Sequence, residues 1–234
     1  MSYFNSGNRV QGNTPIVTNL IIINVLVYLA QLFFKQIDVT ELGSLHYYKS
    51  EKFYPIQIVS AMFLHSPQTI MHIVFNMFGL YIFGSILERF WGSKRFLFFY
   101  LICGVGASIL EQFTIPYTVE RIVRSLDIHE QGFSIAQITE AYLQEYSSLG
   151  ASGALMGVMA AFAYLFPNTE LMILFIPFPV KAKYLIPFFV LVDLFGGIYG
   201  IPGLNIAHFA HLGGALIGFL LVLYWNKKNR RTFY

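Results

Sequence analysis

Charged residues are scarce in this chain of 234 residues. Lys, Arg, Asp and Glu together make up 12% of it, whereas hydrophobic residues make up 56% and aromatic residues 18%. Soluble globular domains usually carry about 25% charged residues. The mean hydropathy is also positive, at +0.59. This composition excludes an ordinary soluble domain and predicts a protein that resides in a lipid bilayer.

A continuous cationic face is lacking as well. The formal net charge is only +3, and the basic residues are scattered along the chain. Nucleic-acid binding typically requires Lys and Arg clustered on one face. We therefore expect no nucleic-acid partner.

Cysteine is almost absent, because Cys103 is the single example and lies in an apolar run. One cysteine cannot form an intramolecular disulfide, and one soft ligand cannot build a thiolate metal site. We predict that Cys103 is a thiol packed in the core.

Long apolar runs, by contrast, are abundant. A transmembrane helix needs about 20 mostly apolar residues, and six segments qualify: 15–34, 68–87, 95–112, 150–166, 184–199 and 205–224. Two longer connections remain, 35–67 and 113–149, and within the second the residues from Ile135 to Leu149 have the spacing of a short amphipathic helix. These features predict an all-α membrane protein with six transmembrane helices in a single domain over residues 1–234.

The positions of Lys and Arg indicate the orientation of this bundle, because basic flanks are retained in the cytoplasm. With the N-terminus inside, ten of the fifteen basic residues face the cytoplasm, namely Arg9, Arg89, Lys94, Arg95, Lys181, Lys183, Lys227, Lys228, Arg230 and Arg231. The longer outer loops, 35–67 and 113–149, hold only Lys35, Lys49, Lys52, Arg121 and Arg124. Both termini are therefore predicted to be cytoplasmic.

Five polar residues lie at membrane depth, where each is costly and points to function. They are His72, Asn76, Ser152, His208 and His211. All five come early in spans that start at the outer face, so they can converge within about 10 Å of depth. Two pairs of glycines, Gly153 with Gly157 and Gly214 with Gly218, would let the fourth and sixth helices pack closely.

This arrangement suits nucleophilic catalysis, because close packing would bring Ser152 within hydrogen-bond reach of His211 and a serine needs an adjacent base. Ser152 stands in Gly150-Ala151-Ser152-Gly153 at a helix N-terminus, where backbone N–H groups are free to bind an oxyanion. His72 and Asn76 can supply further donors.

Other interpretations of these residues stay open at this point. His65, His72, His208 and His211 could bind a metal, although HExxH is absent and the serine would stay unexplained. The small-residue run around Ser152 could be only a helix crossing. Asp193 in the fifth span could orient His211, but we interpret it as a structural hydrogen-bonding residue and expect a Ser-His dyad.

Several strings together resemble the rhomboid family of intramembrane serine proteases, over nearly the whole chain. They are His72-Ile73-Val74-Phe75-Asn76-Met77, Glu88-Arg89-Phe90-Trp91-Gly92-Ser93, Gly150-Ala151-Ser152-Gly153, and Ala210-His211-Leu212-Gly213-Gly214 with Gly218. The chain departs from many members at Ile56-Gln57, where they carry Trp-Arg.

The resemblance implies a six-helix rhomboid bundle that cleaves transmembrane protein substrates near the outer membrane boundary and needs no cofactor or metal. It implies Ser152 as nucleophile, His211 as general base, and an oxyanion hole of His72, Asn76 and the Ser152 backbone N–H. Gly150, Gly153 and His208 would be supporting residues.

Two other classes of function compete with the protease. A catalytically inactive rhomboid-like protein would bind client transmembrane helices, although such relatives typically lose the serine or the base. A transporter with a polar pathway is disfavoured by the lack of an intramembrane carboxylate chain. Because the chain is compact and shows no organelle-targeting extension, we expect a bacterial inner membrane as its location.

Overall fold

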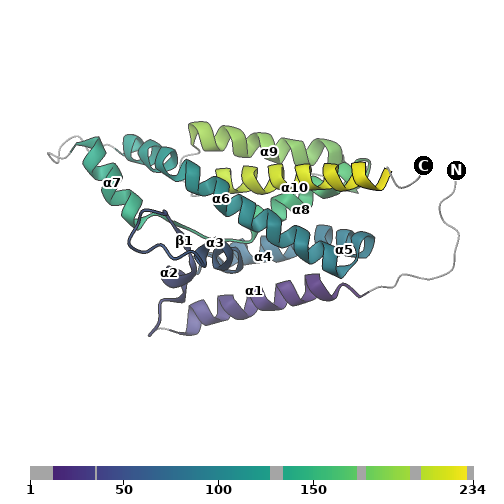
Figure 1. Ribbon diagram of the computed structural model, residues 1–234, viewed down its shortest axis with the longest axis horizontal. Coiled ribbons are helices and arrows are strands. Elements are labelled where there is room, and N and C mark those ends of the chain that lie inside the picture. Colours follow the sequence, from purple (N-terminus) through teal and green to yellow (C-terminus); the bar gives the residue numbers. More distant parts are fainter. Residues whose placement is uncertain (1–12, 35, 127–133, 173–177, 201–206, 231–234) are drawn as a thin grey trace, which may run out of the picture.

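The computed structural model describes residues 13–34, 36–126, 134–172, 178–200 and 207–230. For residues 228–230 it describes the backbone only. Helices that run along one long axis dominate it (Figure 1). Five helical units are long and apolar enough to cross a membrane: α1 (Pro15–Phe33), the continuous unit Ile70–Trp91, α6 (Ser93–Ser125), α9 (Ala182–Tyr199) and α10 (His208–Arg230). The unit Ile70–Trp91 consists of α4 (Ile70–Gly79), a π-helical segment η2 (Leu80–Gly84) and α5 (Ser85–Trp91).

The sixth apolar helix, α8 (Ser152–Leu165), is the shortest. Its 14 residues extend for about 21 Å, less than the roughly 30 Å of a hydrocarbon core. Its first residue, Ser152, can therefore lie below the membrane surface. Each of the six predicted spans overlaps one of these helices, although several helices extend beyond the predicted bounds, and the all-α membrane class is confirmed. Residues 205 and 206, where the sixth span was predicted to begin, lie outside the described residues, as do Arg9, Lys35 and Arg231.

The prediction for the third span was wrong at its outer end. Instead of stopping at residue 112, α6 continues to Ser125 and includes Pro116. Beyond the predicted end, Ile115, Val119 and Val123 repeat every four residues and are buried against Leu143. Because this apolar stripe finds a partner outside the bilayer, the helix extends into the segment that was predicted as loop.

Short elements form a cap at one end of the bundle (Figure 1), named the outer cap here because the sequence predicts that this end faces outward. They are α2 (Val39–Gly43), β1 (Leu45–His46), α3 (Gln57–Ser60), the 3₁₀ turn η1 (Ala61–Phe63), α7 (Ile135–Glu145) and β2 (Ser147–Ser148). The predicted amphipathic helix is confirmed in α7, although it ends four residues early. Antiparallel pairing of β1 with β2 joins the two outer segments. A second pair, β3 (Glu170–Leu171) with β4 (Val180–Lys181), closes the connection between α8 and α9.

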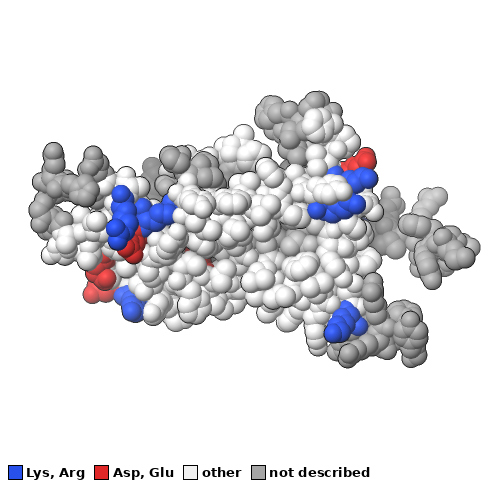
Figure 2. Space-filling view, turned by 90° about the horizontal axis from the view of Figure 1, so that it is seen from above, with Lys and Arg blue, Asp and Glu red and all other residues white. Residues whose placement is uncertain are grey.

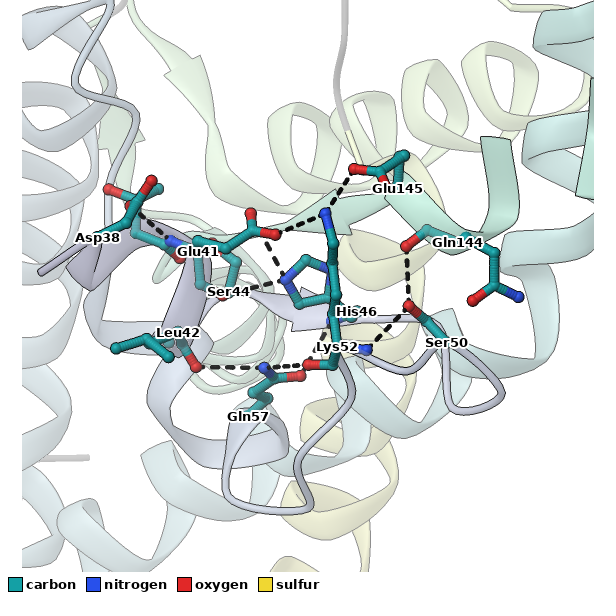
Figure 3. A network of polar contacts seen from close by, with 12 residues as sticks. Asp38, Glu41, Leu42, Ser44, His46, Ser50, Lys52, Gln57, Gln144 and Glu145 are labelled. Atoms are coloured by element: carbon teal, nitrogen blue, oxygen red, sulfur yellow. Dashed lines mark hydrogen bonds and ion pairs between the residues drawn. The ribbon is translucent and has the colours of Figure 1, made fainter. Parts of the chain in front are cut away.

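Gln57 organises the first outer segment from its interior (Figure 3). The side chain is fully buried. Its oxygen accepts hydrogen bonds from the backbone N–H groups of His46 and Tyr54, at 3.3 and 3.2 Å. Its amide nitrogen donates to the carbonyls of Leu42 and Lys52, at 3.2 and 2.9 Å. Since buried backbone groups must find partners, this single amide stabilises the loop where Trp-Arg stands in many rhomboids.

Lys52 connects this loop to α7 (Figure 3). Its ammonium group lies 2.9 Å from the Glu41 carboxylate and 2.5 Å from that of Glu145. Hydrogen bonds to the two carboxylates raise the pKa of Lys52 above its usual value. Nearby, the Ser50 hydroxyl donates to the Gln144 carbonyl at 2.8 Å. The two outer segments thus form one cap.

Glycines allow α8 and α10 to pack backbone to backbone, as predicted. A Cβ at Gly214 would overlap the Gly153 carbonyl, and one at Gly218 would lie 2.5 Å from the carbonyl oxygen of Gly157. Cys103 fills the other side of Gly157 and is a buried free thiol, which confirms its predicted place in the core.

The exterior carries a broad apolar belt. Large apolar side chains are exposed on several helices, for example Phe33, Phe75, Phe113 and Tyr199. On the face shown in Figure 2, Lys and Arg lie toward the two ends of the long axis, and other residues form the band between them. An exposed apolar surface of this extent is suited to lipid rather than to water. The chain is an integral, multi-pass membrane protein.

Candidate active site

Ser152 begins α8 directly after a tight backbone turn. The turn is at Gly150, whose φ of +136° is a backbone conformation that residues with a side chain rarely adopt. A Cβ at this position would also lie 2.9 Å from the Nε2 atom of His72. The Gly150 N–H donates to the Ala61 carbonyl at 2.9 Å. Just before Gly150 in the chain, strand β2 pairs with β1. The outer cap therefore determines where the serine stands.

Ser152 and His211 meet across the glycine contact between α8 and α10. The Ser152 Oγ atom lies 2.8 Å from the His211 Nε2 atom. His211 is the fourth residue of α10 and is partly buried, with its side chain 17% exposed. The structure thus brings together the two residues that the sequence paired, at the outer ends of their helices.

Asp193 of α9 approaches the other side of the His211 ring. The His211 Nδ1 atom lies 3.0 and 3.1 Å from the two carboxylate oxygens of Asp193. The His208 Nδ1 atom lies 2.7 Å from one of these same oxygens. From the sequence, Asp193 was interpreted as a structural hydrogen-bonding residue, and a Ser-His dyad was expected. In the structure its carboxylate contacts the histidine that faces Ser152. Residue spacing could not show this, because 18 residues separate Asp193 from His211 along the chain.

His72 points from α4 toward the serine loop. The Ser66 backbone N–H donates to the His72 Nδ1 atom at 3.2 Å, so the ring proton lies on Nε2, which faces Gly150. One turn later, the buried Asn76 amide donates to the His72 carbonyl at 2.8 Å. The second N–H of that amide is left for another acceptor. The two residues predicted to bind an oxyanion thus share one face of α4, and of the two it is His72 that lies beside the serine loop.

The four histidines do not converge on a common point. His65 packs edge-on against His72, with ring centroids 5.1 Å apart, whereas His208 and His211 share Asp193. Within the described part of the chain, no group of three His, Cys, Asp or Glu residues is arranged to hold a metal ion.

A small cavity adjoins Ser152 between α6, α8 and the outer cap. Its volume is about 30 Å³, and its lining includes Ser152, Ser108, Ser148 and Glu111. This is room for one water molecule among polar partners. The Glu111 carboxylate is buried and accepts a hydrogen bond from the Tyr146 hydroxyl at 3.2 Å. Glu111 was not among the predicted site residues, although it lies within the predicted third span, where an ionisable side chain is costly and points to function.

Fold and site together define a multi-pass membrane protein with a serine and a histidine paired inside the bundle. Comparison with known proteins identifies the group. Residues 52–228 match the Rhomboid domain, which is most of the chain, and the protein belongs to the rhomboid family.

Individual relatives are similar at modest identity. The chain is 32% identical to RHOMBOID-like protein 6, mitochondrial, of Arabidopsis thaliana, over 70% of this chain and 42% of that protein. It is 29% identical to Rhomboid protein 1, mitochondrial, of Saccharomyces cerevisiae, over 74% of this chain and 42% of that protein. It is 28% identical to Rhomboid protease AarA of Providencia stuartii, over 90% of this chain and 72% of that protein. The chain thus spans less than half the length of the first two relatives.

Proposed function

We propose that this protein is a rhomboid serine endopeptidase that cleaves transmembrane proteins near the outer membrane boundary. The observation that carries the proposal is the 2.8 Å contact between the Ser152 Oγ and His211 Nε2 atoms at the start of a short membrane helix. The similarity to AarA, whose name identifies it as a protease, supports the same reaction class.

The proposed reaction starts when Ser152 Oγ attacks the scissile carbonyl and its proton passes to His211 Nε2. The carbonyl oxygen becomes an oxyanion beside the N–H groups at the start of α8, where His72 and Asn76 are candidate donors. Collapse of this intermediate transfers the proton to the leaving amine and forms an acyl-enzyme. Water then attacks the ester while His211 Nε2 accepts its proton. The bond between the acyl carbon and Ser152 Oγ breaks, the proton passes from His211 to Ser152 Oγ, and the new carboxyl terminus of the substrate leaves.

Cleavage by variants in liposomes tests this proposal. We expect Ser152→Ala and His211→Ala to lower the cleavage rate of a single-span test substrate by at least about 1000-fold. Ser125→Ala, which changes an exposed serine at the end of α6, is the matched control and should cleave at the wild-type rate. Undiminished cleavage by either active-site variant would refute the proposed chemistry.

Labelling with a fluorophosphonate separates the protease from an inactive protein that binds client helices. The protease should react at Ser152, and Ser152→Ala should abolish the label. A folded protein that stays unlabelled while a known serine hydrolase reacts would support client binding instead.

We also propose a bacterial inner membrane with both termini in the cytoplasm. The location is an expectation from the sequence alone, and the distribution of Lys and Arg supports the orientation. The names of other relatives place those proteins in mitochondria or chloroplasts. Recovery of the protein in an organelle fraction of its host would overturn the proposed location.

A further inference from the structure

Asp193 is a carboxylate that the proposed reaction does not use, although it contacts the proposed base. It lies on α9, is 7% exposed, and faces two histidines of α10 at once. We propose that Asp193 is a positioning residue that selects the reactive form of His211, and that His208 holds Asp193 in place. This inference rests on the proposed protease function.

The chemical argument concerns the proton on the His211 ring. An ionised carboxylate only accepts hydrogen bonds, so the His211 Nδ1 atom must carry the proton to make its contacts of 3.0 and 3.1 Å with Asp193. In neutral His211 the Nε2 atom is then an acceptor, 2.8 Å from the Ser152 Oγ atom. This is the tautomer that can take the proton of serine. The opposite tautomer would donate to Ser152 and could not act as its base.

Charge is balanced during the proposed step. When the Ser152 proton moves to Nε2, His211 becomes an imidazolium ion and the substrate carbonyl becomes an oxyanion. Asp193 stays ionised throughout and lies beside the new positive charge, which it stabilises. The proton later leaves on the amine of the departing chain, so Asp193 neither gains nor loses one.

His208 fixes the position of the carboxylate. Its Nδ1 atom lies 2.7 Å from the Asp193 oxygen that also faces His211. The His208 ring is 4% exposed and lies on Gly196, one turn after Asp193 on α9; a Cβ there would be 2.6 Å from the ring. Because His208 and His211 are three residues apart on α10, they reach the same carboxylate from one face.

Two variants test the role of Asp193. One removes its charge while its shape is conserved, and the other disturbs its contact with His208. Asp193→Asn retains the size of the side chain but removes its charge. Gly196→Ala inserts a methyl group whose nearest atoms are those of the His208 ring. Gly197→Ala is the matched control, because the nearest atoms to its methyl group would be those of the Phe209 ring.

The decisive measurement is histidine tautomerism by ¹⁵N NMR of the labelled protein in a Ser152→Ala background, which needs no activity. We expect the His211 ring to carry its proton on Nδ1 with Asp193 present and to shift toward the Nε2 tautomer in Asp193→Asn. With Ser152 intact, kcat should fall about 100- to 10,000-fold in Asp193→Asn and about tenfold in Gly196→Ala, with little change in KM. Gly197→Ala should retain both the tautomer and kcat.

The inference is overturned if Asp193→Asn retains the Nδ1 tautomer at His211, or if its kcat stays within twofold of wild type. A chain that cleaves no substrate but still shows the Asp193-dependent tautomer would refute the protease and leave the positioning role intact. The two failures are therefore distinguishable.

Discussion

His65 is uncharged in the folded protein mainly because of its burial. It is fully buried, and neither ring nitrogen has a hydrogen-bond partner among the described residues. Burial lowers the pKa of His65 to about 3, and the neighbouring His72 contributes in the same direction. The folded protein thus keeps His65 neutral at pH values where the unfolded chain would protonate it.

The lowered pKa of His65 predicts that the folded protein becomes less stable as the pH falls. Because the folded pKa lies below the unfolded value of about 6.5, the contribution of His65 is constant above pH 6.5 and declines as the pH falls toward 3. We expect a loss of about 2 kcal/mol in the free energy of unfolding between pH 7 and pH 5. Denaturant titrations of detergent-solubilised protein at the two pH values measure it.

His65→Phe keeps a buried ring that cannot take up a proton, so the same titrations should show a smaller loss between pH 7 and pH 5. An equal loss in the variant and the wild type would assign the pH dependence to other groups.

At the scale of elements, the contact between α8 and α10 leaves no room for side chains at the glycines of α10 that face α8. It places the main chain of Gly157 where any side chain at Gly218 would have to lie, with distances from a Cβ of 2.5 Å to the oxygen and 2.6 Å to the Cα atom. Backbone atoms cannot move aside as a flexible side chain can. The same contact positions Ser152 against His211, so packing and chemistry are coupled.

Gly218→Ala is therefore expected to destabilise the fold by about 1–3 kcal/mol and to lower activity as the helices separate. Gly79→Ala is the matched control, because the nearest atoms to its methyl group would belong to the flexible side chain of Leu155, at 2.8 Å. Thermal unfolding and cleavage rate should both change more in Gly218→Ala. Equal effects of the two variants would argue against a backbone contact.

At the scale of the whole molecule, α6 is long enough to extend from one membrane face to the other. Its 33 residues extend for about 50 Å, which exceeds the roughly 30 Å hydrocarbon core. In Figure 1, the start of α1, the end of α10 and the junction of α5 with α6 all lie at the same end of the bundle, opposite the cap. The exposed Lys94 and Ser125 mark the two ends of this helix.

The proposed orientation can be measured from these two positions. In a Cys103→Ala background, which removes the only cysteine, we expect a membrane-impermeant maleimide to label Ser125→Cys in intact cells. Lys94→Cys should react only after permeabilisation. The reverse pattern would place the termini on the outer side.

Much of this architecture could be predicted from local sequence. Apolar length gave the class and the approximate spans, and the rule that buried polar groups need a purpose selected His72, Asn76, Ser152 and His211. The class and the spans could be predicted because hydrophobic length and helical periodicity act within single segments. The glycine pairs also predicted the closest helix contact, since only missing side chains permit it.

Other features depend on contacts between segments that are distant along the chain. The extension of α6 to Ser125 needs Leu143 from the cap, and the burial of Gln57 needs the backbone of the whole first outer segment. The sequence by itself determined that this is a multi-pass membrane protein with a serine and a histidine at one depth. Only the tertiary structure decided that Asp193 faces His211, because the packing of α9 on α10, and no local pattern, brings that carboxylate to the ring.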